Sequence, residues 1–345
     1  MTFVALTAAV SLVAACGSDD DTGAADTDAV PSETDAAPIE TDAAPVDTEA
    51  DDMADDDMAD DIDRSDWPDS IVMGAVPSEE STALQESYEK LLEVLELDLG
   101  IEVEFFQATD YAGIIEGQVA GRVDLAQYGP FSYVIAKNAG ADIAPVGALV
   151  DDPEEQPGYQ SYGITKSDND EINELADFAG RSVCFVDPGS TSGFLYPSAG
   201  LIAEGIDPES GVSAVFAGGH DASVISVNNG DCEAGFAFDA MVDNVLIESG
   251  DISEGDIKTV WESEVIAGSP IAINLELPAS LIAEINRIVL EESNTDRLIE
   301  RGICTDVESC GLTDENAWGW VVVDDSFYDG VREVCVQTQA AQCES

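Results

Sequence analysis

The chain has 345 residues, 73 acidic and 11 basic side chains, and a net charge of −62 at pH 7. Binding to nucleic acid depends on Lys and Arg side chains that neutralise phosphates, so this balance excludes a nucleic-acid partner. The length is sufficient for two domains, and the acidity is typical of surfaces adapted to saline surroundings.

The N-terminal run MTFVALTAAVSLVAAC is apolar and short, and it ends in small residues before Cys16. It is too short for a permanent membrane helix and is typical of a secretory signal, although no Lys or Arg precedes it. Its last residues, VAAC, resemble the bacterial lipobox, in which the cysteine carries lipid. We expect residues 1–16 to be a lipoprotein signal peptide; an ordinary cleaved signal and a buried apolar segment are the alternatives.

Residues 17–66 consist mainly of Asp, Ala, Thr and Pro, with 20 acidic residues and one basic residue. Such a segment cannot bury an apolar core, so it is predicted to be a disordered acidic tether that self-repulsion extends. Behind a lipidated Cys16, it would hold the globular part of an extracytoplasmic protein away from the membrane.

Strand and helix patterns alternate from Trp67 onward. The first series predicts strands at 70–77, 101–108 and 124–129, with helices at 79–100, 110–123 and 130–140. The second predicts strands at 181–186, 212–218 and 233–238, with helices at 194–206, 221–230 and 241–250. This alternation predicts an α/β protein of two units with parallel sheets and a ligand cleft between them.

The stretch DPGSTSGFLYP (187–197) places Ser190, Thr191 and Ser192 between two glycines, after an apolar strand and before a helix. Helix capping accounts for one of the hydroxyls. The others favour an anion site, because the N–H groups at a helix start attract negative charge. On this stretch alone both interpretations stay open.

Several phrases, in order, resemble the PhnD-like proteins, the substrate-binding components of phosphate, phosphite and phosphonate ABC importers. They are VPSEE (76–80), ATDYAGIIEGQVAGRVDLAQYGPFSYVIA (108–136), DPGSTSG (187–193), FAGGHDASVISVNNGDCEAGFAF (216–238) and IAGSPI (266–271). The resemblance implies a type II periplasmic-binding-protein fold, with two α/β lobes, a hinge and a central ligand cleft. Residues 67–163 would begin lobe 1, residues 164–265 would form lobe 2, and residues 266–345 would complete lobe 1.

The resemblance also implies the ligand-binding residues. They are Tyr111, Tyr128, Ser190, Thr191, Ser192, His220, Asp239 and Ser269. The hydroxyls, the Tyr111 phenol and the His220 ring would hold the oxygens of a phosphorus oxyanion, and Gly129 and Pro130 would shape the floor. Each has a structural alternative: the two tyrosines as core aromatics, His220 as a structural histidine and Asp239 as a helix cap.

The resemblance places Asp239 and Ser269 against the remaining substituent of the ligand. An ionised Asp239 would accept a hydrogen bond from a P–OH group and reject sulfate, and Ser269 stands where a second amine-binding acid would be. We therefore expect phosphate or phosphite, with methylphosphonate next, and no cofactor or metal. The partners would be an ABC permease and its ATPase, and this chain would act as a monomer.

Six cysteines remain after Cys16, and in an exported protein they suggest three disulfides, although six cysteines allow fifteen pairings. Cys184 lies in the first strand of lobe 2 and Cys232 enters a neighbouring strand, which predicts that they pair. Cys304 with Cys310 and Cys335 with Cys343 would close short C-terminal loops.

Two other function classes remain to be weighed. GSTSG has the glycine frame of a hydrolase nucleophile turn, with His220 as base and Glu204, Asp207 or Glu209 as third member, but Thr191 stands where Ser should. A binding protein that signals to a membrane histidine kinase would carry the same sequence features. We expect a transport protein and not an enzyme.

Overall fold

The computed structural model describes residues 62–79, 81–313 and 317–344. The expected signal peptide, the lipid-carrying Cys16 and nearly all of the acidic tether lie outside these residues. Among the described helices, none combines the length and the apolar composition that crossing a bilayer requires.

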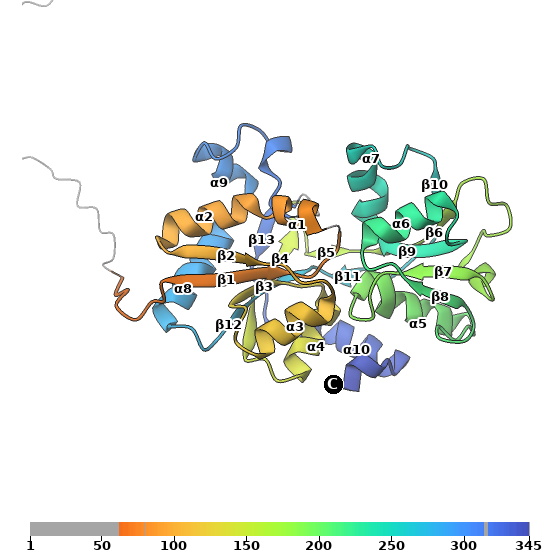
Figure 1. Ribbon diagram of the computed structural model, residues 1–345, viewed down its shortest axis with the longest axis horizontal. Helices are drawn as coiled ribbons and strands as arrows, with labels where there is room; N and C mark the ends of the chain where they lie inside the picture. Colours follow the sequence, from red (N-terminus) through yellow and green to blue (C-terminus); the bar gives the residue numbers. More distant parts are fainter. Residues whose placement is uncertain (1–61, 80, 314–316, 345) are drawn as a thin grey trace, which may run out of the picture. The chain divides into compact units, whose positions relative to one another are not determined.

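Six strands form the first sheet, in the order β13–β4–β12–β3–β1–β2 (Figure 1). They are β1 (Ser70–Ala75), β2 (Glu102–Phe106), β3 (Leu125–Gln127), β4 (Ile143–Val150), β12 (Pro270–Asn274) and β13 (Gly319–Val321). β1 pairs in parallel with β2 and β3, whereas β12 is antiparallel to β3 and β4. We call this sheet and its helices the first lobe.

Five strands form the second sheet, in the order β10–β6–β9–β7–β8. They are β6 (Ser161–Lys166), β7 (Ser182–Phe185), β8 (Ser213–Phe216), β9 (Ala234–Phe238) and β10 (Ile257–Glu262). β7 is parallel to β8 and β9, but β6 is antiparallel to β9 and β10. We call this sheet and its helices the second lobe. The parallel pairing predicted from the sequence is present in β7, β8 and β9, but both sheets are mixed. In this lobe β6 is the reversed strand, because the connection from β6 to β7 contains no α-helix to return the chain to the end of the sheet where β6 began.

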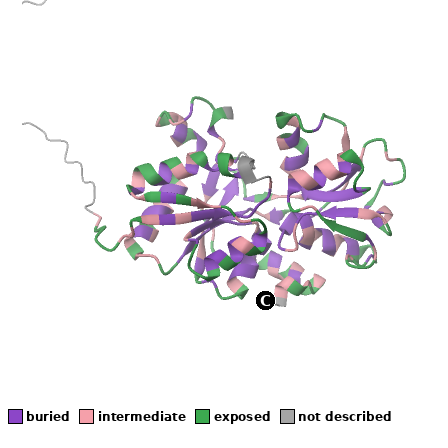
Figure 2. Ribbon diagram, viewed as in Figure 1, coloured by how far each residue is buried: buried purple, intermediate pink, exposed green. Residues whose placement is uncertain are grey.

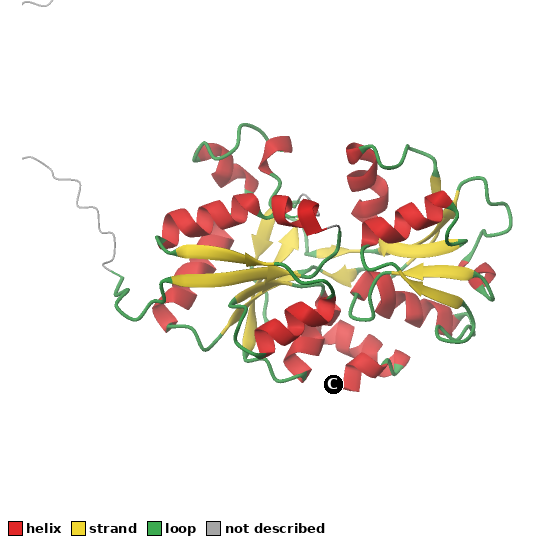
Figure 3. Cartoon of the chain, viewed as in Figure 1, coloured by secondary structure: helices red, strands yellow, loops and turns green. Residues whose placement is uncertain are grey.

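Helices cover both faces of each sheet (Figure 3). In the first lobe they are α1 (Ser81–Ser87), α2 (Glu89–Leu99), α3 (Tyr111–Val119), α4 (Pro130–Asn138), α8 (Ala279–Arg287), α9 (Thr295–Glu300) and α10 (Asp329–Thr338). In the second lobe they are α5 (Tyr196–Ala203), α6 (His220–Asn229) and α7 (Leu246–Ser249). There are also short π-helical segments. η2 (Thr191–Leu195) leads into α5, η3 (Met241–Val245) leads into α7, and η4 (Ile288–Glu292) follows α8. Four 3₁₀ helices complete the described set: η1 (Leu175–Phe178), η5 (Glu308–Cys310), η6 (Asp325–Tyr328) and η7 (Ala341–Glu344).

The single helix predicted over 79–100 is in fact two helices that meet at Tyr88. The Tyr88 side chain is buried and its ring stacks on Phe105, with 5.9 Å between the centroids. Beyond this break, α2 buries Leu91, Val94 and Leu95 on one face, the spacing expected of an amphipathic helix. The break between the two helices thus coincides with a buried aromatic contact to β2.

Buried residues are concentrated on the inner strands of both sheets (Figure 2), and most of them are apolar. One cluster lies beneath α2 and α8, and a second lies beneath α3 and α4. Val186 and Leu195 of the second lobe belong to this second cluster, as do Val331 and Cys335 of α10. The two lobes are thus in apolar contact beside the site described below.

The two lobes are connected by crossing segments that pair as a short ladder, β5 (Gly158–Tyr159) with β11 (Ile266–Ala267). A Cβ atom on Gly158 would lie 2.7 Å from the Val265 side chain, and one on Gly268 would lie 2.7 Å from Pro157. Side chains at these two positions would therefore separate the crossing segments.

Three disulfides are present: Cys184–Cys232, Cys304–Cys310 and Cys335–Cys343. These are the pairings predicted from the sequence. The first ties β7 to the turn before β9, and the other two close loops near the C-terminus.

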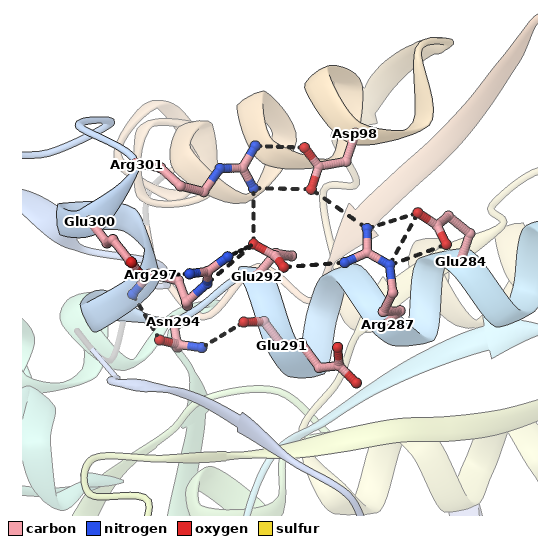
Figure 4. A network of polar contacts seen from close by, with 9 residues as sticks. All are labelled: Asp98, Glu284, Arg287, Glu291, Glu292, Asn294, Arg297, Glu300 and Arg301. Carbon is pink, nitrogen blue, oxygen red and sulfur yellow. Dashed lines mark hydrogen bonds and ion pairs between the residues drawn. The ribbon is translucent and has the colours of Figure 1, made fainter. Parts of the chain in front are cut away.

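Three of the few arginines gather in one ion-pair network of the first lobe (Figure 4). Glu292 lies 3.2 Å from Arg287, 2.9 Å from Arg297 and 3.5 Å from Arg301. Arg301 also forms a bidentate pair with Asp98 of α2. The network therefore joins α2 to the segment from α8 to α9.

Candidate functional site

A small cavity of ≈ 30 Å³ lies between the lobes, where strands of both sheets end and helices begin. We call it the oxyanion cavity. Its lining consists of Val76, Ser78, Tyr88, Tyr111, Gln127, Tyr128, Gly129, Tyr159, Ser190, Thr191, Ser192, His220, Phe238 and Ser269. Seven of the eight residues that the sequence analysis assigned to the ligand are in this lining; Asp239 is not.

Helix starts from both lobes surround the oxyanion cavity. α3 begins at Tyr111, α4 begins at Pro130 and α6 begins at His220. The turn that starts η2 supplies a fourth, with Ser190 as its cap. Each start carries partial positive charge from its unpaired N–H groups, so the cavity favours an anion.

The hydroxyls of Ser190 and Thr191 are arranged to donate. Oγ1 of Thr191 accepts a 2.8 Å hydrogen bond from the Phe131 amide, and Oγ of Ser190 accepts a 3.0 Å bond from the Gly193 amide. A hydroxyl whose oxygen accepts from an N–H group still has its own hydrogen to donate. Both hydrogens are therefore available for oxygens of a ligand in the cavity.

His220 is a third neutral donor. Its side chain is only 3 % exposed, and burial lowers its pKa to about 3. Nδ1 accepts a 3.2 Å hydrogen bond from the Phe238 amide, so the neutral ring carries its proton on Nε2. Nε2 lies 3.3 Å from Oγ of Ser190, so the Nε2 proton points toward the side of the cavity that holds the Ser190 and Thr191 hydroxyls.

The hydroxyl of Tyr128 is buried without a hydrogen-bond partner among the described residues. Burial raises the pKa of this phenol, so the group stays protonated. A buried polar atom without a partner costs free energy, and a ligand oxygen in the cavity would supply the partner.

Hydrogen bonds join the lobes around the cavity. Besides the bond from Phe131 to Thr191, the His220 amide donates to the Ser78 carbonyl at 2.6 Å. The Tyr111 amide donates to the Asp187 carboxylate, which lowers the pKa of Asp187 against the larger opposite effect of burial. The cavity is thus enclosed by groups from both lobes, and no Lys or Arg is among the described residues that line it.

Asp239 lies in a neighbouring cavity. Its carboxylate accepts hydrogen bonds of 2.9 Å from the Gln160 amide and 3.0 Å from the Ala240 amide. These bonds lower its pKa, but burial raises it by more. The carboxylate thus ties the residue before β6 to the end of β9, but it does not cap η3, whose first turn has no side-chain cap. A bond from Asp239 to a P–OH group stays a prediction.

The geometry of a hydrolase is not assembled at the GSTSG turn. Nδ1 of His220 is paired with the Phe238 amide, where a triad would place a carboxylate. Asp207, a candidate third member, caps the amides of Glu209 and Ser210 at the end of α5.

Sequence reasoning missed several lining residues. Gln127 ends β3, and its position at the carboxyl end of a strand was a usable signal. Ser78 lies inside the quoted phrase VPSEE. Tyr88 and Tyr159 had no local signal, because a helix break and a lobe crossing bring them to the cavity.

Comparison with known proteins identifies the family. The family described as "ABC transporter, phosphonate, periplasmic substrate-binding protein" matches residues 73–311. The chain belongs to this family. Proteins of the family bind substrate outside the cytoplasm for an ABC transporter.

Individual relatives agree with this assignment. The phosphate-import protein PhnD of Mycolicibacterium smegmatis is 50 % identical over 284 residues, which are 80 % of this chain and 88 % of the relative. A binding protein of a phosphonate ABC transporter from Pseudomonas aeruginosa superposes with a TM-score of 0.68 at 22 % identity, covering 78 % of this chain and 86 % of its own. A Prochlorococcus marinus protein in complex with methylphosphonate also superposes with a TM-score of 0.68, at 18 % identity. The match covers 79 % of this chain and 99 % of that protein. The fold is that of the type II periplasmic binding proteins, as predicted.

Proposed function

We propose that this chain captures a small phosphorus oxyanion, phosphate or phosphite and less readily methylphosphonate, in the oxyanion cavity. The observation that carries the proposal is the polarity of the lining: four neutral side chains carry a polar hydrogen, and no acidic side chain is among the described residues that line the cavity. Ser190, Thr191, His220 and Tyr128 are neutral donors, and the helix starts add backbone N–H groups. Hydrogen bonds to a charged acceptor are about twice as strong as those between neutral groups.

The captured anion passes to an ABC permease driven by its ATPase. This step rests on the family, and the phosphate-import relative supports phosphate as the cargo. Lipid on Cys16 anchors the chain to the outer side of the cell membrane, and residues 17–66 act as the tether. The protein works as a monomer of two lobes, with the crossings between them at β5 (Gly158–Tyr159) and β11 (Ile266–Ala267).

A thermal-shift panel of phosphate, phosphite, methylphosphonate, 2-aminoethylphosphonate and sulfate tests the proposal. Binding to the native state alone stabilises a protein by about 2.7 kcal/mol when the ligand is at a hundred times its Kd. We expect shifts of that order with phosphate and phosphite, and a smaller shift with methylphosphonate. Stabilisation by sulfate or 2-aminoethylphosphonate alone would contradict the proposal.

A further inference from the structure

A second cavity, of ≈ 170 Å³, lies beside the oxyanion cavity. It is lined mostly by other residues, among them Asp239 and Asp243 of the second lobe and Leu149 of the first. The two linings share only Tyr159 and Ser269. A residue that lines two separate cavities stands in the wall between them, so these two side chains form the partition.

The partition is held in place by the lobe crossing. Tyr159 is the second residue of β5 and pairs with Ile266 of β11. Next to this pair, Gly158 and Gly268 approach the opposite segment so closely that a Cβ atom at either position would lie 2.7 Å from it. The Tyr159 ring also packs against the apolar cluster that contains Phe238 and Met241. Its backbone is therefore fixed at the crossing, and its ring is fixed on the second lobe.

Tyr159 supplies most of the bulk of the partition, because Ser269 has a small side chain. We propose that Tyr159 is a specificity-determining residue, whose ring closes the oxyanion cavity and limits the phosphorus substituent to the size of a hydroxyl, a hydrogen or a methyl group. This inference rests on the proposed function. Without the ring, the two cavities would join, and a longer substituent would extend into the second one.

The second cavity would then favour a cationic substituent. The Asp239 and Asp243 carboxylates line it, and Asp243 accepts a 3.0 Å hydrogen bond from the Tyr162 hydroxyl. An ammonium group on a two-carbon chain would carry the charge that these carboxylates attract. 2-Aminoethylphosphonate is therefore the probe that gains most when the partition opens.

The experiment compares wild type with Tyr159→Ala, Tyr159→Leu and Tyr159→Phe by calorimetry with phosphate and with 2-aminoethylphosphonate. The quantity to compare is the ratio of the two Kd values within each protein, which cancels any general effect on binding. We expect the ratio for 2-aminoethylphosphonate over phosphate to fall about tenfold or more in Tyr159→Ala and Tyr159→Leu, and to keep its wild-type value in Tyr159→Phe. Tyr159→Leu also lacks the ring but keeps apolar contact with the second lobe, so it provides the same test if Tyr159→Ala does not fold.

An unchanged ratio in the folded ringless variants would overturn the inference, as would an equal fall in Tyr159→Phe. A wild type that binds 2-aminoethylphosphonate as tightly as phosphate would also overturn it. Failure of the wild type to bind phosphate, phosphite or methylphosphonate is a different result, because it contradicts the proposed function itself.

Discussion

The backbone amide of Phe238 donates a 3.2 Å hydrogen bond to Nδ1 of His220 and so fixes the proton of the neutral ring on Nε2. The partner comes from the end of β9, and the ring stands at the start of α6. A strand end and a helix start of the same lobe therefore set the hydrogen-bonding role of the one histidine in the chain.

This arrangement predicts a pH dependence of stability. Burial lowers the pKa of folded His220 to about 3, whereas the unfolded ring keeps its ordinary value of about 6.5. Between these two pKa values only the unfolded chain binds the proton. The folded state is therefore not penalised for its neutral His220 above pH 6.5, and it loses stability relative to the unfolded chain as the pH falls below 6.5. Relative to His220→Asn, wild type should lose stability with a slope that approaches about 1.4 kcal/mol per pH unit below pH 6 and is about half of that between pH 7 and 6. Urea unfolding of both proteins at pH 7, 6 and 5 measures this difference, and parallel pH profiles would show that the folded ring titrates normally.

Thr191→Val should weaken phosphate binding. The substitution removes the hydroxyl that accepts from Phe131 across the lobes and that we expect to donate to the ligand. Loss of such a group typically costs about 1.5–3 kcal/mol, or ten- to a hundredfold in Kd. Thr191→Ser keeps the hydroxyl and is the matched control. Equal calorimetric affinity in the valine and serine variants would place the anion elsewhere.

Tyr128→Phe should separate stability from binding. Its hydroxyl is buried without a partner among the described residues, so removing it should leave the ligand-free protein as stable as before, or more stable by about 1 kcal/mol. Phosphate affinity should nevertheless fall. Thermal unfolding without and with phosphate measures both effects. A variant that is less stable without ligand and binds normally would assign the hydroxyl a structural role.

Glu292→Gln should destabilise the first lobe. Its side chain is 16 % exposed and pairs with three arginines, so neutralising it removes three ion pairs at one largely buried carboxylate. We expect a loss of about 1–3 kcal/mol in the free energy of unfolding. Glu300, which pairs with Arg297 at a 69 % exposed position, provides the control, because exposed pairs contribute about 0–1 kcal/mol. Equal losses in Glu292→Gln and Glu300→Gln would show that the network acts as separate surface pairs.

Local sequence predicted the parts of the site that local chemistry builds. Ser190 to Ser192 follow a strand and begin a helix, and His220 follows two glycines at another helix start; both signals lie within a few residues. Tyr159 reaches the cavity only through the crossing of β5 and β11, and Phe131 contributes a backbone amide that any residue carries. The antiparallel placement of β12 between β3 and β4 depends on a return of the chain over more than a hundred residues, so no short pattern could show it.

The central claim is that a phosphorus oxyanion is bound within reach of His220. Because the chain has one histidine, ¹⁵N–¹H NMR of protein labelled at histidine yields the signals of a single ring during a phosphate titration. We predict a saturable shift of the Nε2–H signal, with Nδ1 remaining an unprotonated acceptor throughout. An imidazole signal that does not move at phosphate concentrations that saturate the calorimetric heat would contradict this placement of the ligand.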